Sequence, residues 1–388
     1  MQTGARHPWA NRADDPDRGT RPVWARWNES LERRYTVGVE EELMLLHRPD
    51  NSLAHSSDAV LARISPDLQR HTSPETHASV IELATGIHLD APGAAAELAA
   101  LRACLARELA AIGLAAACAG TYPLACADEV KVSGAARYGV VAGSMRMLAR
   151  RPPTMALHVH VGVPDPEDAI RLLNALREVM PVLLALSANS PFYQARDTGF
   201  ASARTAIFGA FPRTGTARRF VNYGDYVGTV QPLIASGALA DPSFLWWDAR
   251  LQPGLGTVEV RVMDAQSTIA DSTPLVALVQ SYARLALEDE YPDSHTAPEI
   301  LAENRFLAAR DGLRAHLIDP NRRRLLPVQT PAEALLRRCR PHAAALGCGA
   351  ELAQIDQLAT ANGADRQRAQ ATNSGLANLV QTLAECFT

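Results

Sequence analysis

The ten residues TVGVEEELML, at positions 36–45, place three consecutive glutamates inside a run of otherwise apolar side chains. The apolar residues on both sides of the glutamates predict a β-strand. Successive side chains of a strand point to opposite faces, so Glu40 and Glu42 share one face, and Glu41 is left to pair with a helix on the other. Two neighbouring carboxylates repel each other and resist burial unless something cationic lies between them. The segment therefore predicts a metal ion, an arginine or a helix end beside Glu40 and Glu42.

Three further segments carry the same alternation of apolar and polar side chains. They are SVIELATG at 79–86, ALHVHVGV at 156–163 and GTVEVRVMDA at 256–265. Each predicts a strand with one apolar face, and the other face carries charged residues, namely Glu82, His158, His160, Glu259 and Arg261. A sheet with one apolar and one charged face is typical of antiparallel strands that helices cover on one side only. We therefore expect these charged groups to line a single cleft.

The remaining segments are mostly helical in pattern. Helices are expected over 92–118 and over 165–188, the second with an interruption at Pro181, and the chain is helical for most of its length after 272. The stretch 189–230 has weak periodicity and predicts a long loop. The fold class is therefore α+β, an antiparallel sheet with helices on one face and a helical C-terminal region.

The composition limits the class of protein. A chain of 388 residues that is 47% hydrophobic can bury a large core, and a net charge of −4 gives no general reason to expect binding to nucleic acid or an anionic membrane. No run of 18 or more apolar residues predicts a transmembrane helix. The six cysteines form no C-x-x-C pair, which favours free thiols in the cytoplasm. Residues 1–32 predict a poorly ordered extension before a single domain over 33–388.

The charged cleft favours a divalent cation with oxygen ligands. The carboxylates, among them Glu75 and Glu82, outnumber the histidines, and hard ions such as Mg²⁺ or Mn²⁺ prefer oxygen, whereas Zn²⁺ prefers nitrogen and sulfur. Several carboxylates around Mg²⁺ usually accompany a phosphorylated partner. The sequence has no Walker loop, kinase signature or G-x-G-x-x-G after a strand, so a nucleotide would bind directly on the sheet.

Six segments in order resemble one known family. YTVGVEEELML, SPETHASVIELATG, LHVHVGV, LSANSPFYQARDTGFASART, GTVEVRVMDAQST and ENRFLAARDGL, between about residues 35 and 315, are together similar to the bacterial carboxylate–amine ligases of the glutamate–cysteine ligase type 2 group. The resemblance implies a fold like the catalytic domain of glutamine synthetase, in which helices lie behind a curved antiparallel sheet. It also implies ATP-dependent amide formation through an acyl phosphate, with release of ADP and phosphate.

The resemblance implies roles for individual residues. Metal ligands would be Glu40, Glu42, Glu75, Glu82, Glu259 and His158. His160 and Arg261 would lie at the nucleotide phosphates, and Arg261 and Arg204 would stabilise the transferred phosphoryl group. Arg204 is also expected near the substrate carboxylate. The implied cofactors are ATP and Mg²⁺ or Mn²⁺, and the implied partners are a small acid and a small amine.

The substrate end of the cleft is less well defined. Arg196, Trp247 and Arg250 are further candidates there, although Arg196 also fits an exposed loop charge, and Trp247, like its neighbour Trp246, fits a core residue or pocket wall. Ala203 stands where the family pattern leads us to expect an aromatic residue such as tyrosine. That difference would reshape the acceptor pocket, so the substrates of the best-known relatives are not carried over.

Two other functions stay open from the sequence alone. One is a metal-dependent hydrolase in which His158 and His160 bind zinc, although the other histidines fall in loops or helical segments. The other is a non-catalytic relative that has kept the fold; the complete set of expected ligands argues against it. ATP dependence and bound-metal analysis would separate these alternatives from a ligase. The apolar helical segments and the resemblance also predict a homodimer or larger assembly.

Overall fold

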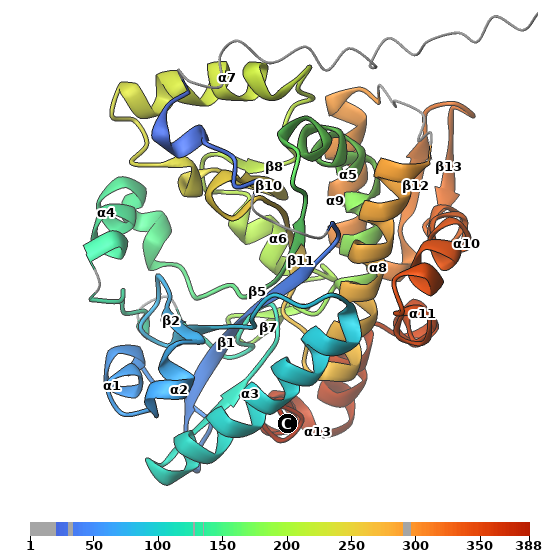
Figure 1. Ribbon diagram of the computed structural model, residues 1–388. Helices are drawn as coiled ribbons and strands as arrows, with labels where there is room; N and C mark the ends of the chain where they lie inside the picture. The colour runs from blue at the N-terminus through green and yellow to red at the C-terminus, as the bar shows by residue number, and fades with distance from the viewer. Residues whose placement is uncertain (1–20, 30–33, 127–128, 135, 290–295) are drawn as a thin grey trace, which may run out of the picture.

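The computed structural model describes residues 21–29, 34–126, 129–134, 136–289 and 296–388 (Figure 1). Within these residues the largest sheet has seven strands in the order β10-β11-β5-β1-β3-β2, and β4 pairs with the far end of β1. All neighbours in this sheet are antiparallel. The strands are β1 (Val37–His47), β2 (Thr72–Pro74), β3 (Val80–Ala84), β4 (Leu114–Ala117), β5 (Ala156–Gly162), β10 (Ala249–Gln252) and β11 (Thr257–Asp264).

Three long helices cover the apolar face of the sheet. They are α3 (Ala91–Ala111), α5 (Pro166–Ser187) and α8 (Ile269–Glu288), and they contact β1, β5 and β11. Alternate residues of the strands, such as Val159 of β5 and Val260 of β11, are fully buried against them. Asp165 and Thr268 cap the N-termini of α5 and α8 through their side chains. The predicted α+β class, antiparallel with helices on one face, is confirmed.

The C-terminal region is mainly helical, as predicted, and packs beside α5 and α8 (Figure 1). Its elements are α9 (Pro298–Asp311), β12 (His316–Asp319), β13 (Arg324–Pro327), α10 (Gln329–Ala345), α11 (Gly349–Ala353), α12 (Ile355–Thr360) and α13 (Gly363–Glu385). Smaller elements surround the open face of the sheet. They are α1 (Ser57–Leu61), α2 (Pro66–Gln69), α4 (Ala136–Met145), β6 (Phe192–Tyr193), β7 (Arg196–Asp197), α6 (Ala203–Phe208), β8 (Thr214–Gly215), α7 (Tyr223–Ala235) and β9 (Trp246–Trp247).

Two predicted helices differ from the structure. The helix expected over 92–118 ends at Ala111, where Gly113 adopts a φ of +77° and turns the chain into β4. The helix α5 continues through Pro181 without a break, because the surrounding helix is buried and its packing outweighs the one lost backbone hydrogen bond. In both cases tertiary packing decided what the local pattern left open.

The stretch 189–230 is not one long loop. It contains α6 and most of α7, and these short helices begin at side-chain caps from Ser202 and Asn222. Of the predicted extension 1–32, residues 1–20 and 30–32 lie outside the described residues. Residues 21–29 are packed on the body, since the indole of Trp27 is buried and donates a hydrogen bond to the Val163 carbonyl at 2.8 Å. Among the described helices, none combines the length and apolar character needed to cross a membrane.

Candidate functional site

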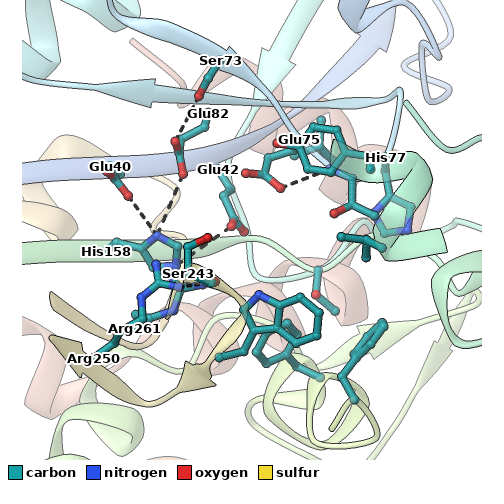
Figure 2. A pocket seen from close by; sticks show the side chains of 18 of the residues that line it. Glu40, Glu42, Ser73, Glu75, His77, Glu82, His158, Ser243, Arg250 and Arg261 are labelled. Atoms are coloured by element: carbon teal, nitrogen blue, oxygen red, sulfur yellow. Dashed lines mark hydrogen bonds and ion pairs between the residues drawn. The ribbon is translucent and has the colours of Figure 1, made fainter. Parts of the chain in front are cut away.

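A cleft of about 310 Å³ opens on the face of the sheet that the long helices leave uncovered. Its floor comes from β1, β3, β5, β10 and β11, and one wall is aromatic. Figure 2 shows the polar groups of the floor pointing toward one another from these strands. The strand register explains the arrangement, since Glu42 lies opposite Glu82, Glu40 opposite His158, and Glu259 opposite His160. Antiparallel pairing thus concentrates the charged face of four strands at one place.

Two groups of possible metal ligands meet at His158. Ligand atoms of Glu40, His158 and Glu259 lie within 4.8 Å of one another, and so do those of Glu42, Glu82 and His158. His158 Nδ1 lies 3.3 Å from Glu40 and 3.8 Å from Glu259. The imidazole is buried, and both burial and the nearby Arg261 lower the pKa of His158. A neutral imidazole among carboxylates is the form that binds a metal ion.

Glu259 is held by three donors. Arg250 reaches it with two nitrogens at 2.9 and 3.1 Å, Gln252 donates from 2.6 Å, and Arg261 forms a further ion pair. Burial alone would raise the pKa of Glu259, but the two arginines hold that pKa well below its ordinary value. This carboxylate is therefore ionised, and its position is fixed.

The other carboxylates of the floor are crowded. Burial, and then the charges of Glu40, Glu75 and Glu42, raise the pKa of Glu82 well above its ordinary value. Glu40 behaves in the opposite way: burial disfavours its ionised form, but hydrogen bonds from His158 and His160 lower its pKa. One strand pair thus carries two carboxylates whose pKa values are driven apart, as is common at functional sites.

The donor set of the cleft fits a divalent cation. Several carboxylates converge, and the most crowded of them, Glu82, has no arginine or lysine partner among the described residues and lies 4.0 Å from the imidazole of His158. His158 Nε2 and Arg261 Nε are buried without a hydrogen-bond partner among those residues. A bound cation would relieve the repulsion between the carboxylates, and an anion beside it would accept from Arg261. Oxygen-rich coordination of this kind suits Mg²⁺ or Mn²⁺.

Arg204 lies at the edge of the cleft, on the first turn of α6. Its two terminal nitrogens donate to backbone carbonyls of β11, to Val262 at 3.1 Å and to Arg261 at 3.0 Å. The guanidinium is buried, and burial lowers the pKa of Arg204. The side chain therefore contacts both the cleft and the backbone of the strand that carries Glu259.

Comparison with known proteins identifies the family. The sequence model of glutamate–cysteine ligase family 2 matches residues 36–377. The chain belongs to this family. A candidate glutamate–cysteine ligase 2-1 from Rubrobacter xylanophilus is 39% identical over 88% of this chain and 91% of its own length. A candidate glutamate–cysteine ligase 2 from Gloeobacter violaceus is 35% identical over 86% of this chain and 91% of its own length.

Solved structures share the fold. The glutamate–cysteine ligase of Francisella tularensis, in complex with AMP, matches with a TM-score of 0.67 at 13% identity, over 91% of this chain and 88% of that one. A bifunctional glutathione synthetase from Pasteurella multocida matches with a TM-score of 0.66 at 14% identity, over 91% of this chain and 52% of that one. Membership of the glutamate–cysteine ligase family 2 supports a ligase, and the expected family resemblance is confirmed.

The structure brings most of the predicted site residues of this family member together. The cleft is lined by Glu40, Glu42, Glu75, Glu82, His158, His160, Arg204, Arg250 and Arg261, and Glu259 lies buried beneath it. Glu75 lines the cleft without joining either ligand group, although its charge contributes to the raised pKa of Glu82. Glu41 points to the helices, as predicted, and forms an ion pair with Arg102 at 2.7 Å.

Three residues with predicted substrate roles lie elsewhere. Arg196 is exposed on the two-residue strand β7, and Trp247 packs against Phe220 with ring centroids 6.0 Å apart. Neither residue lines the cleft. For Trp247 the reason is the alternation along β9, which turns Trp246 toward the cleft and Trp247 away from it. Ala203 is buried and is not among the residues that line the cleft, and its expected effect on an acceptor pocket stays a prediction.

Several lining residues were not predicted from the sequence, although Trp246 does form part of a pocket wall, one of the two roles expected for it. The aromatic wall consists of Phe208, Phe211 and Trp246, in mutual contact at 5.7 to 6.4 Å between centroids. Gln252 completes the donors to Glu259 from β10, a four-residue strand that the sequence analysis did not predict. The alternation of Arg250 and Gln252 is the only signal for it, and four residues are too few to distinguish a strand from a loop.

Proposed function

We propose that the protein is an ATP-dependent carboxylate–amine ligase that forms an amide and releases ADP and phosphate. The observation that carries the proposal is the carboxylate cluster, with Arg250 and Arg261 beside it, on the open sheet of a glutamate–cysteine ligase family 2 member. Carboxylates suit Mg²⁺ or Mn²⁺, and buried arginines suit phosphate oxygens. The AMP bound by the Francisella ligase supports the use of an adenine nucleotide.

The proposed reaction has two steps. A carboxylate oxygen of the acid attacks the γ-phosphorus of ATP, the bond to the bridging oxygen of ADP breaks, and an acyl phosphate forms. The amine nitrogen then attacks the acyl carbon, the bond to the phosphate oxygen breaks, and the nitrogen releases a proton to water. Phosphorylation is required because the carbon of a free carboxylate is too poor an electrophile for an amine.

The residues of the chain would mainly position and neutralise charge, as is general for phosphoryl transfer. The proposed metal ligands are Glu40, Glu42, Glu75, Glu82, Glu259 and His158. The ion they hold would neutralise charge on the phosphates. Arg261 has a buried Nε available to a phosphoryl oxygen, and His160 would donate to the nucleotide phosphates because the carboxylates Glu40 and Glu259, acting against burial, raise the pKa of His160. Arg250 fixes Glu259 and does not need to contact substrate.

The test is an ADP-release screen with purified protein, ATP and Mg²⁺ against panels of acids and amines. We expect ADP formation that requires both an acid and an amine, with one amide formed for each ADP released. Acid-dependent ADP formation without amine would reveal the first step alone and would still support the proposal. ATP-independent hydrolysis of amides or esters would overturn it in favour of a hydrolase.

The zinc hydrolase receives little support from the geometry. Each ligand group among the described residues contains a single histidine, His158, and the remaining ligands are glutamates. A catalytic zinc site normally offers more nitrogen or sulfur ligands. Assembly as a homodimer and a cytoplasmic location stay predictions, and light scattering at micromolar concentration would check the first.

A further inference from the structure

Strand β11 contains an irregularity directly beside the catalytic cleft. Val260 pairs with Val159 of β5, but the next pair is Met263 with Leu157. Between these two pairs β11 therefore contains one more residue than β5. This is a β-bulge, and it contains Arg261 and Val262. Bulges bend the strand and re-aim side chains, and they are enriched next to active sites. Here the bulge sets the direction of Arg261, two residues after Glu259.

A bulge leaves backbone groups without their ladder partners, and these need other partners when they are buried. The carbonyls of Arg261 and Val262 accept from the two terminal nitrogens of Arg204, at 3.0 and 3.1 Å. On the other side, the N–H of Arg261 donates to the carbonyl of Asp248 at 2.7 Å. The planar fork of Arg204 thus bridges two consecutive carbonyls of the bulge, which a lysine ammonium could not do with the same geometry.

Arg204 is itself held by a buried acid at the end of the same strand. Asp264 is fully buried and lies 3.7 Å from Arg204. It accepts hydrogen bonds from the hydroxyls of Ser190 at 2.7 Å and Ser202 at 2.8 Å, and from the N–H of Asn189 at 2.8 Å. Ser190 in turn accepts from the backbone N–H of Arg204 at 3.1 Å. The network is tight, since a methyl group added at Gly120 would come within 2.7 Å of the Asp264 carboxyl.

We propose that Arg204 and Asp264 act as a bulge clamp, a pair of positioning residues that fix the β11 backbone and thereby aim Arg261 into the cleft. Asp264 fixes the first turn of α6 through Ser190 and Ser202, and Arg204 links that turn to the two carbonyls of the bulge. Arg204 also lines the cleft, so a direct contact with substrate is the competing role. The catalytic consequence rests on the proposed function, because it assumes that Arg261 meets the transferred phosphoryl group.

The kinetic test is a double-mutant cycle of Arg204→Lys and Arg261→Lys. If Arg204 acts through Arg261, Arg204→Lys lowers kcat by about tenfold in the wild-type background and by less than about twofold in Arg261→Lys. The KM for ATP stays within about twofold, because the clamp aims one group and does not bind the nucleotide. Asp264→Asn, which keeps the shape of the side chain, gives a smaller loss of kcat with the same unchanged KM. Losses that multiply in the double mutant would show that Arg204 contacts substrate directly and would overturn the clamp.

A second measurement is independent of turnover. We expect Arg204→Lys to accelerate amide hydrogen exchange in the segment 257–265 of the full chain without ligands, since the bulge loses its fixed partners. The matched control is Arg218→Lys, which alters an exposed ion pair with Asp225 away from the cleft. If Arg204→Lys does not fold, Ser202→Ala removes one donor to Asp264 and is measured instead. Unchanged exchange in the folded variant overturns the clamp; a faster exchange in a protein without any ATP turnover would retain the clamp and reject the proposed function.

Discussion

The two faces of strand β1 carry the same residue type in opposite circumstances. On the helix face, Glu41 is fully buried and has one full cationic partner, Arg102, together with the hydroxyl of Ser272 at 2.6 Å. On the cleft face, Glu40 and Glu42 lie with Glu82 and Glu259 around two histidines and two arginines. The helix face matches charges one to one, whereas the cleft face gathers an excess of carboxylates.

The difference separates a structural carboxylate from a functional one. Arg102 also donates to the carbonyls of Gln266, Ser267 and Phe387, at 2.9 to 3.2 Å, so the pair ties α3 to the region before α8 and to the C-terminus. The carboxylate of Glu41 and the guanidinium of Arg102 are thus both paired within the protein. In the cleft, the pKa of Glu82 is raised and His158 Nε2 has no partner among the described residues. The proposed cation and nucleotide would supply the partners that this face lacks.

Removing divalent cations should have the largest effect on the cleft face. With EDTA-treated protein and metal-free buffer we expect ATP turnover to disappear, because the excess carboxylates would repel the phosphates. Mg²⁺ or Mn²⁺ should restore turnover, and a zinc-selective chelator should leave it unchanged. Full activity in metal-free buffer would place the carboxylates in the same structural class as Glu41.

Removing Arg102, the partner of Glu41, should have the largest effect on the free energy of unfolding. Breaking a buried ion pair from one side costs about 3–5 kcal/mol, since an uncompensated charge is left behind. We expect Arg102→Met to lower the free energy of unfolding in urea by that amount. The matched comparison is Arg171→Met, which should cost less than about 1 kcal/mol because the Arg171 side chain is exposed and its partner Asp168 keeps a second ion pair with Arg34. Equal losses in the two variants would contradict the structural role of Arg102.

Neutralising a cleft carboxylate should affect turnover more than stability. Glu40→Gln should reduce turnover by about a hundredfold, comparable with the loss of one strong electrostatic contact in an active site. Its unfolding free energy should fall by less than that of Glu259→Gln, because the loss of the hydrogen bonds from His158 and His160 is partly offset by relief of the repulsion with Glu82. Glu259→Gln is the informative contrast: it should reduce turnover similarly but also destabilise the fold, since Arg250 and Arg261 lose their buried partner. Near-normal turnover of Glu40→Gln would remove that residue from the site.

Sequence reasoning reached the cleft because its floor is made of long alternating strands. The period of two along β1, β5 and β11 fixes which side chains share a face, and antiparallel pairing then needs only the register. The parts that it missed depend on tertiary structure. The β11 bulge, the four-residue strand β10 and the inward turn of Trp246 have no local periodicity that could reveal them. Gly113, by contrast, was a readable signal for the end of α3, and Ser202 and Asn222 were readable caps.

The smallest expected effect is a change in how stability depends on pH. Burial and the neighbouring carboxylates raise the pKa of Glu82, so the folded protein keeps a proton at pH values where the unfolded chain has lost it. Stability from this group is therefore lost as the pH rises above the unfolded value of about 4.3 and through the folded pKa. We expect metal-free wild-type protein to lose stability relative to Glu82→Gln across that window. Mg²⁺ should reduce the difference in unfolding free energy between wild type and Glu82→Gln at the upper end of this pH range, because a cation bound only to the folded state stabilises it by mass action.

Glu97 provides the control of opposite sign. Its burial would raise its pKa, but the hydrogen bonds from His88 and from the N–H of Gly86 outweigh this and lower the pKa of Glu97. Stability from Glu97 is therefore present above the unfolded pKa and is lost as the pH falls. The free energy of unfolding of the wild-type protein should accordingly rise relative to that of Glu97→Gln as the pH increases toward the unfolded pKa. Urea unfolding of the three proteins between about pH 2.5 and 8, with and without Mg²⁺, measures both slopes, since the Glu97 slope lies below the unfolded value of about 4.3 and the Glu82 slope above it. If Glu82→Gln is less stable than wild type at pH 8 in chelator, or its difference from wild type is flat, the carboxylates of the cleft are not in excess, and the contrast between the two faces of β1 fails.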